Sequence, residues 1–414
     1  MARPQDWDTA YEFRAITLLA FSFGLVGLDR WVLPPLFPEM MAELHLDYQD
    51  LGSLVGILGI AWGVSSVFMG GLADRIGRKR VLVPAVAVFS LLSAFSGMAG
   101  GLASLMLVRA LMGAAEGAVA PTAVTMARDA SHPRRLGMNS GVYQCALALF
   151  GLAIAPIVAT QLLQVTSWRN VFLIVCAPGL IVAAIMWATL RESLVRTPLT
   201  DPSPRHASLA LVFGHRNVLL GMAALLCAMT GVFVLSAVTP NYLRDYLQLT
   251  NQQMGFVTSG IGFGGCLGQL VVLTLSDFVG RRLATTMSFV LSAIFLWFFI
   301  RTGTDPLMLF VMLFGTAFFT FGALAVIAGP LVAEAAPPGL VATAAGVVIG
   351  AGEIFGGGVA PAIAGTIAQN YGIQFTLVFA LAGLVGGLFV SLFLLETSPR
   401  RRNAPVDPRP LRLS

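Results

Sequence analysis

Long apolar stretches, each followed by a short polar turn, run through the whole sequence. A helix needs about 20 predominantly apolar residues to cross a bilayer, and most of these stretches reach that length. We expect spans near residues 15–38, 50–73, 81–99, 103–128, 136–163, 169–190, 217–243, 252–275, 283–301, 306–333, 340–368 and 374–395. The pattern therefore predicts an all-α membrane protein with twelve transmembrane helices.

One polar turn occurs twice. It reads GGLADRIGRKR at residues 70–80 and LTLSDFVGRR at 273–282. Three residues recur 203 positions later: Asp74 as Asp277, Gly77 as Gly280 and Arg78 as Arg281. A duplicated membrane bundle predicts two pseudo-symmetric halves of six helices. We place them at residues 1–190 and 217–397, joined by a cytoplasmic linker at 191–216 and followed by a cytoplasmic tail at 398–414.

Composition and charge support the membrane prediction. Only 11% of the residues are charged, against about 25% in a soluble domain. The arginines and lysines gather in loops on one side, which places both termini in the cytoplasm of a bacterium whose inner membrane holds the protein. This asymmetry accounts for the net charge of +5 without nucleic-acid binding. The four cysteines fall inside predicted spans without metal-ligand spacing, so we expect no metal or cofactor.

The repeated turn resembles the loop signature of the major facilitator superfamily, and the stretch from Arg109 to Gly113 resembles its span-four motif. The chain is identified as a member of that superfamily over nearly its full length. The resemblance implies a cytoplasmic gate, which we assign to Asp74, Arg78, Arg128, Asp277 and Arg281. A carboxylate such as Asp74 is stabilised at the N-terminus of another helix. The alternative is that these basic residues only fix the orientation.

Five charged residues lie deep inside the predicted spans, away from the span ends. Each costs about 2.5–3.5 kcal/mol at the bilayer centre, so each needs a partner or a function. Asp29, Arg30, Glu116 and Glu353 fall near one depth, and Arg109 lies seven residues before Glu116 on the same helix face. Two positive charges face three potential negative charges, and a proton on one carboxyl removes the excess. We therefore predict proton coupling at the three carboxyls.

Two alternatives stay open for these charges. Arg109 and Glu116 are also placed to form a permanent structural ion pair. Glu353 lies in a glycine-rich helix, where a hydrogen bond across a helix interface would suffice. Asp29 and Arg30 are adjacent and point about 100° apart, so they need separate partners.

The Asp29-Arg30 dipeptide, taken with Glu116-Gly117, resembles the organic-anion:proton symporters of the anion:cation symporter family. That resemblance implies that Arg30 meets the substrate while Asp29 and Glu116 carry protons. A similar dipeptide occurs in spinster-type lipid transporters, so the motif leaves the substrate open. Glu353 has no counterpart in the symporter pattern. Other residues that we expect to line the cavity are Arg109, Tyr143 and Gln144.

Three hypotheses follow. The first is a proton-coupled symporter that imports a small organic anion, embedded in lipid and acting as a monomer. The second is a proton-driven exporter of a lipid-like or drug-like amphiphile, which the missing span-five Gly-Pro signature disfavours. The third is a sensor or membrane enzyme, for which the sequence offers neither a long loop nor a catalytic motif. We therefore expect a transporter and not an enzyme.

Overall fold

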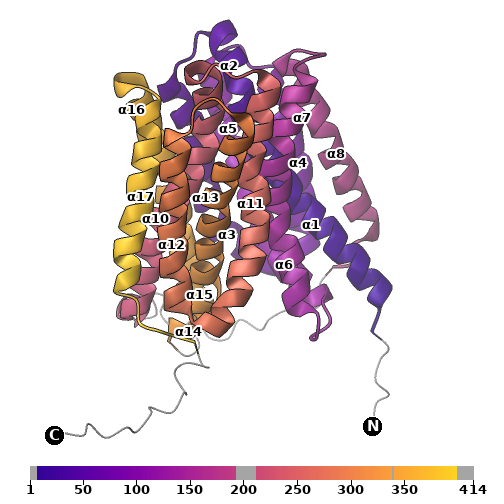
Figure 1. Cartoon of the computed structure of the whole chain (residues 1–414). Coiled ribbons are helices and arrows are strands. Elements are labelled where there is room, and N and C mark those ends of the chain that lie inside the picture. Colours follow the sequence, from indigo (N-terminus) through magenta and orange to yellow (C-terminus); the bar gives the residue numbers. More distant parts are fainter. Residues whose placement is uncertain (1–6, 193–210, 338–339, 399–414) are drawn as a thin grey trace, which may run out of the picture.

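The computed structural model describes residues 7–192, 211–337 and 340–398, without the side chains of Asp74 and Ala342. The predicted linker lies mostly, and the tail almost wholly, outside these residues. The described chain is helical, and Figure 1 shows one upright bundle. Its N-terminal half consists of α1 (Thr9–Trp31), α2 (Leu33–Leu44), α3 (Tyr48–Ile76), α4 (Arg78–Gly97), α5 (Leu102–Ala130), α6 (Leu136–Leu147), η1 (Ala148–Ile154), α7 (Ala155–Leu162) and α8 (Trp168–Thr189).

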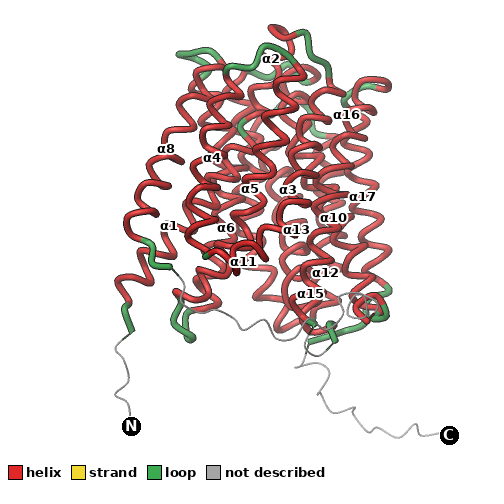
Figure 2. The backbone as a smooth tube through the Cα atoms, turned by 180° about the vertical axis from the view of Figure 1, so that it is seen from behind, coloured by secondary structure: helices red, strands yellow, loops and turns green. Residues whose placement is uncertain are grey.

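The C-terminal half repeats this layout. It consists of α10 (Arg216–Asn241), η2 (Tyr242–Tyr246), α11 (Asn251–Val279), α12 (Arg281–Arg301), α13 (Pro306–Val326), η3 (Ile327–Leu331), α14 (Val332–Ala335), α15 (Val341–Ala351), η4 (Gly352–Val359), α16 (Ala360–Tyr371) and α17 (Gln374–Leu392). Twelve helical segments are long and apolar enough to cross a membrane, as predicted. The beginning of α1 and the end of α17 lie at the same end of the bundle (Figures 1 and 2). We call this the basic end.

The first predicted span is one continuous helix in the sequence analysis, but in the structure it is two. Helix α1 ends at Trp31, Val32 forms a bend, and α2 begins at Leu33. Pro34 and Pro35 follow the bend. Proline has no N–H to donate to the carbonyl four residues earlier, so these two residues interrupt the hydrogen-bond ladder beside Arg30. The break lies two residues after Arg30, and Pro34 leaves the Arg30 carbonyl without its usual helical donor.

The repeated polar turn has the same geometry in both halves. Gly77 and Gly280 have φ angles of 110° and 99°, which favour glycine. Helix α4 or α12 begins at the next residue, and a carboxylate from the end of the same half binds its first N–H groups. Lys79 N donates to Glu192 Oε1 (3.1 Å), and Arg281 N donates to Glu396 Oε1 (2.8 Å). The sequence analysis assigned such a helix-end contact to Asp74, whose side chain lies outside the described residues.

Glycines bring the two halves into backbone contact away from the basic end. Gly56 and Gly59 of α3 lie so close to η4 that an added Cβ would meet the carbonyl oxygens of Gly358 and Gly357 at 2.7 Å and 2.5 Å. Across the halves, α3 packs along η4 and α16 and touches α15 only slightly, while α11 packs mainly against η1 and α7. The halves are therefore sealed from the bundle centre to the end opposite the basic one, which we call the sealed end.

Two wide helical turns lie at matching places in this interface. The π-helical segments η1 and η4 each lead into a helix with proline at its second position, Pro156 in α7 and Pro361 in α16. The wide turn η4 carries Glu353. π-Helical turns occur frequently at functional sites, and here one of them presents a charged side chain to the other half.

Candidate functional site

Arg30 reaches from the N-terminal half into the C-terminal half. Its guanidinium carbon lies 4.6 Å from the ring centre of Phe233 on α10 and 5.7 Å from that of Trp31. Its Nη2 lies 3.5 Å from Oε2 of Glu353 on η4. The Arg30 and Glu353 side chains are both buried. The structure thus joins two residues that the sequence analysis could place only at a common depth.

Asp29 points elsewhere, as the 100° separation of adjacent helical residues requires. Its carboxyl lies beside the hydroxyl of Ser93 on α4, within the N-terminal half. Its backbone carbonyl, beside the α1 break, accepts a hydrogen bond from Arg109 Nη1 (3.3 Å). The Arg109 guanidinium also lies 5.8 Å from the ring centre of Phe172. Asp29 therefore binds Arg109 through its backbone carbonyl, and its carboxyl takes no part in that hydrogen bond.

Glu116 is the most isolated of the buried carboxyls. It is fully buried on α5, and neither of its oxygens has a hydrogen-bond partner among the described residues. Nor does any described ion pair join it to Arg109. The alternative of a closed structural bridge between these two residues is therefore absent from this conformation. Burial of an unpartnered carboxylate is costly, and a proton on the carboxyl avoids that cost.

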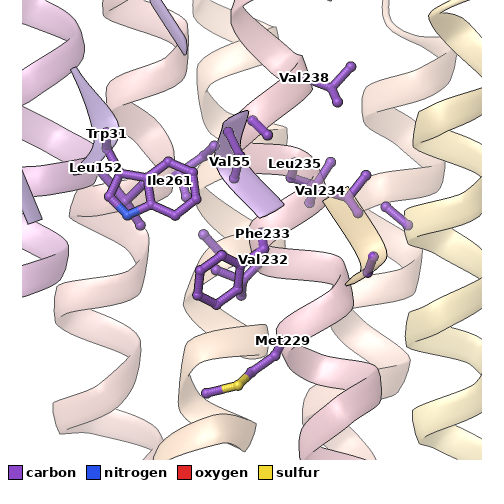
Figure 3. Packing of buried hydrophobic residues seen from close by; sticks show 14 of the residues in the cluster. Trp31, Val55, Leu152, Met229, Val232, Phe233, Val234, Leu235, Val238 and Ile261 are labelled. Atoms are coloured by element: carbon purple, nitrogen blue, oxygen red, sulfur yellow. The ribbon is translucent and has the colours of Figure 1, made fainter. Parts of the chain in front are cut away.

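A small cavity separates the two arginines. Arg30 and Arg109 line it together with aliphatic side chains from α2 and α3: Leu33, Leu54, Val55 and Leu58. Its volume is about 10 Å³, room for roughly one water. Figure 3 shows buried apolar side chains near the interface of the halves, among them Val55, Trp31 and Phe233. The Trp31 and Phe233 ring centres lie 5.5 Å apart, with the rings tilted by 47°. Arg30 Nε and Nη2 and Arg109 Nε and Nη2 have no hydrogen-bond partner among the described residues, although Arg30 Nη2 lies 3.5 Å from the Glu353 carboxylate.

The two residues of the fifth span that we expected to line the cavity, Tyr143 and Gln144, lie in different environments. Tyr143 is buried, stacks on Phe23 with ring centres 4.5 Å apart, and donates weakly to the Ala120 carbonyl (3.5 Å). Gln144 is exposed on α6 and is not bound to the central charges in any described hydrogen bond. Asn139, on the Tyr143 face, donates to Glu12 Oε1 (2.8 Å) near the basic end. Of the two predicted lining residues, Tyr143 therefore lies in the buried interior and Gln144 does not.

The predicted gate residues lie at the basic end. Arg78 pairs with Asp129, and Arg281 pairs with Asp277 (2.6 Å) and Glu334 (3.1 Å). Arg128 is exposed at the end of α5. The sequence analysis assigned Arg78 and Arg281 to the gate but did not name their ion-pair partners Asp129 and Glu334. Their positions late in other spans gave no local signal.

A second polar cluster, which the sequence analysis missed, joins the halves at the sealed end. The Tyr48 hydroxyl donates to Asp245 Oδ2 (2.9 Å), and Asn241 Nδ2 donates to the same oxygen (3.2 Å). The Tyr48 backbone N–H donates to Gln369 Oε1 (3.3 Å). Tyr48 begins α3 in the N-terminal half, whereas its partners belong to the C-terminal half. Only the fold reveals the pairing, because its members are about 200 and 320 positions apart.

Within the described residues, no group of three or more His, Cys, Asp or Glu side chains could hold a metal ion. The four cysteines are free thiols. Cys145 on α6 lies against Cys266 on α11, with its Sγ 3.5 Å from the Cys266 carbonyl oxygen. The charged groups at the centre of the bundle are two guanidiniums, of Arg30 and Arg109, and three carboxyls: Asp29, Glu116 and Glu353.

Comparison with known proteins gives a consistent result. The sequence model described as "Major Facilitator Superfamily" matches residues 19–245 and 221–413. A probable 4-methylmuconolactone transporter of Cupriavidus pinatubonensis is 26% identical over 91% of this chain and 88% of its own length. The 4-hydroxybenzoate transporter PcaK of Pseudomonas aeruginosa is 25% identical over 69% of this chain and 71% of its own.

The fold also matches solved structures. A bacterial homologue of the human lysosomal transporter Spinster, in an inward-facing and occupied conformation, superposes with a TM-score of 0.77. It is 18% identical in sequence, and the match covers 92% of this chain and 96% of that one. At this identity the similarity establishes a shared fold.

Proposed function

This chain belongs to the Major Facilitator Superfamily, and we propose that it imports a small organic anion together with protons. It is a multi-pass membrane transporter, since its family and its relatives are transporters. Transporters of this superfamily consist of two six-helix halves with the substrate site between them at the bilayer midplane. The proposal concerns what this chain carries, which residues bind it and what drives the movement.

The observation that carries the proposal is the pair of buried arginines with uncommitted donors. An arginine guanidinium suits a planar carboxylate because two parallel N–H groups can meet its two oxygens. Arg30 and Arg109 offer such groups to the cavity between them. Two relatives are named as transporters of 4-methylmuconolactone and of 4-hydroxybenzoate, which supports an organic acid as the substrate. Arg30 is the proposed anchor, and Arg109 and Tyr143 complete the site; Gln144 joins them in another conformation.

The carboxyls supply the proposed proton coupling. With Asp29, Glu116 and Glu353 all ionised, the centre carries one negative charge more than its two arginines compensate, in a region that water hardly reaches. One proton removes this excess, and a bound anion favours a second. Anion and proton then travel in the same direction, so that a proton gradient drives uptake.

The halves rock about this centre in the proposed cycle. The basic end faces the cytoplasm of the bacterial inner membrane because its loops carry the arginines and lysines. Asp74, Arg78, Arg128, Asp277 and Arg281 are the proposed gate on this side. It closes when the sealed end opens, and a single chain suffices for the cycle.

Uptake into proteoliposomes tests the proposal. Purified protein is reconstituted with an inward proton gradient, and uptake of radiolabelled 4-hydroxybenzoate and of D-galacturonate, a sugar acid, is compared with that of Arg30→Ala. We expect uptake of at least one acid by the wild type and a loss of at least 100-fold in the variant, since each lost hydrogen bond to a charged group costs about 1.5–3 kcal/mol. Equal uptake by both proteins contradicts an anion site at Arg30. Proton-driven efflux of a lysolipid, without uptake of any acid, supports the exporter hypothesis instead.

A further inference from the structure

Among the described residues, Glu353 is the one buried carboxyl that reaches the proposed anion site from the opposite half. It extends from η4 to within 3.5 Å of Arg30 Nη2, beside the Phe233 ring that covers the guanidinium. Arg30 belongs to α1, so this contact is an ion pair between halves at the bundle centre. The contact occupies the same guanidinium that the proposed function gives to the substrate.

The pair is longer than two partly exposed ion pairs of the described residues. Arg135–Glu12 and Arg281–Asp277 are both 2.6 Å apart, although one side chain of each pair is exposed to 39% or more. Arg30 Nη2 and Glu353 Oε2 are 3.5 Å apart, and neither atom makes a hydrogen bond in the described structure. Arg30 Nε is equally unpartnered. A carboxylate free to align with the Nε–Nη2 edge can form two charge-assisted hydrogen bonds, which Glu353 does not.

Two ionised carboxylates do not share one buried guanidinium without repulsion. Given the proposed transport of an organic anion, on which this inference rests, we infer that Glu353 is a resident counter-ion that the substrate displaces. When the anion enters, the contact between Arg30 and Glu353 breaks, and the Glu353 carboxylate takes a proton from water on the open side. Arg30 keeps one negative partner throughout, and Glu353 becomes neutral as it leaves.

The surroundings of Glu353 make Arg30 its dominant charged neighbour. Elements α3, α10, α15 and α16 pack against η4. Their titratable residues are Cys227, which lies along α10, and a set near the helix ends: Tyr48, Asp50, Asp74, Arg75, Arg216 and Tyr371. Arg30 is the charged group that the structure places against the Glu353 carboxyl. The competition is therefore between Glu353 and the incoming anion for that single guanidinium.

The same displacement loosens the two halves. In this conformation the ion pair adds to the backbone contacts that hold the sealed end together. A substrate that removes Glu353 from Arg30 removes one inter-half contact at the moment of binding. The residue thus links occupancy of the site to movement of the halves, a role that neither Asp29 nor Glu116 can fill because both belong to the half that carries Arg30.

The first experiment measures binding to the purified protein by isothermal titration, with 4-hydroxybenzoate and D-galacturonate as probes, at pH 6 and pH 8. If Glu353 competes with the probe, wild-type affinity falls as the pH rises. Glu353→Gln should bind about tenfold more tightly than the wild type at pH 8 and lose most of that pH dependence. Unchanged or weaker binding by Glu353→Gln overturns the inference. Failure of the wild type to bind any probe, with Arg30→Ala identical to it, overturns the anion site itself.

The second experiment needs no ligand. Thr160 on α7 is buried against Gly255 of α11 at the sealed end, so a cysteine placed there becomes accessible when that end opens. In a background without native cysteines, Thr160→Cys is labelled from outside with a membrane-impermeant maleimide. Adding Glu353→Gln should speed labelling several-fold. Glu116→Gln, a matched change within one half, should not. Equal rates with and without Glu353→Gln show that the pair does not fasten the halves and overturn the inference even if the anion proposal holds.

Discussion

At the scale of single residues, two buried glutamates illustrate two ways of keeping a carboxyl inside a membrane protein. Glu12 accepts hydrogen bonds from Trp7, Asn139, Arg135 and the His132 backbone, at 2.6–3.0 Å. Glu116 accepts none from the described residues. A carboxyl with four donors is stabilised as an anion, whereas one with none is cheaper to bury with a proton. The two positions should therefore respond oppositely to neutralisation.

Glu116→Gln replaces a proposed proton carrier by a neutral side chain of similar shape. We expect transport driven by a proton gradient to fall at least tenfold, while exchange of labelled for unlabelled substrate persists, since exchange needs no net proton movement. Uptake and exchange of 4-hydroxybenzoate in proteoliposomes, measured on the same preparation, check this. A variant that keeps its full response to the gradient would remove Glu116 from the coupling path.

Glu12→Gln is the matched control. The amide can no longer accept two charge-assisted hydrogen bonds from its donors, and loss of such bonds costs about 1–3 kcal/mol. We expect a lower melting temperature for Glu12→Gln and an unchanged or higher one for Glu116→Gln, measured by thermal unfolding in detergent. If Glu116→Gln proved the less stable of the two, Glu116 would need a structural partner that this conformation lacks.

The sequence predicts the central residues but not their partners. The rarity of charge inside a span singles out Arg30, Arg109, Glu116 and Glu353, because each costs energy unless it is used or paired. Which residues meet depends on how helices from different halves face each other, and sequence periodicity carries no information on that. Gln144 was predicted with Tyr143 because both are polar residues of the fifth span, which borders the cavity in the fold that the chain resembles, although neighbours on a helix point about 100° apart.

At the scale of helices, glycine determines how closely the halves approach. Gly56 and Gly59 of α3 face the backbone of η4, whose carbonyl oxygens would be the nearest atoms to a Cβ added at either position. In a membrane no hydrophobic effect drives helices together. Small residues at helix interfaces instead allow the backbones to approach closely and pack. The glycines in η4 and α3 therefore form one contact surface rather than two flexible stretches.

Gly59→Ala tests this surface. The added methyl would lie 2.5 Å from the Gly357 carbonyl oxygen, and backbone atoms cannot move aside without shifting the helix. Overpacking of this kind costs about 1–3 kcal/mol, which should favour conformations with the sealed end open by at least roughly fivefold. Labelling of Thr160→Cys from outside measures the shift. Gly71→Ala on the same helix has open space around its Cβ and should label at the parent rate; equal rates for both variants would contradict a glycine-dependent seal.

Element positions could be predicted from apolar length, but irregular turns could not. Twelve spans follow from hydrophobic stretches longer than a bilayer requires. The break at Val32 and the wide turns η1 and η4 depend on proline and on neighbouring helices that satisfy the freed backbone groups. The prolines were visible in the sequence at Pro34, Pro156 and Pro361, yet a packing kink and a functional bend look alike there.

At the scale of the whole molecule, the duplicated turn predicted two halves, and the structure bears this out down to the matching carboxylates Glu192 and Glu396. The sequence could not predict which end of the interface is closed, because both conformations use the same residues. In this structure the contacts between halves extend from the sealed end to the centre, where Arg30 meets Glu353. The sealed end must open in the proposed cycle, which exposes the centre to both sides in turn, so its polar contacts would have to break in that cycle.

Tyr48→Phe removes the hydroxyl that joins the halves at that end. Its hydrogen bond to Asp245 is 2.9 Å long and crosses from α3 to η2. Because both side chains are partly exposed, we expect the loss to be about 1 kcal/mol, or roughly a fivefold shift toward conformations that are open at the sealed end. Labelling of Thr160→Cys should accelerate accordingly.

Tyr246→Phe is the control. It removes a hydroxyl from a neighbouring ring that is 52% exposed and stacks on Tyr242 within one half, so the labelling rate of Thr160→Cys in this variant should match that of the parent. Acceleration in both variants would assign the effect to the local surface, whereas acceleration in Tyr48→Phe alone identifies its hydroxyl as a contact that must break before the substrate site opens on this side.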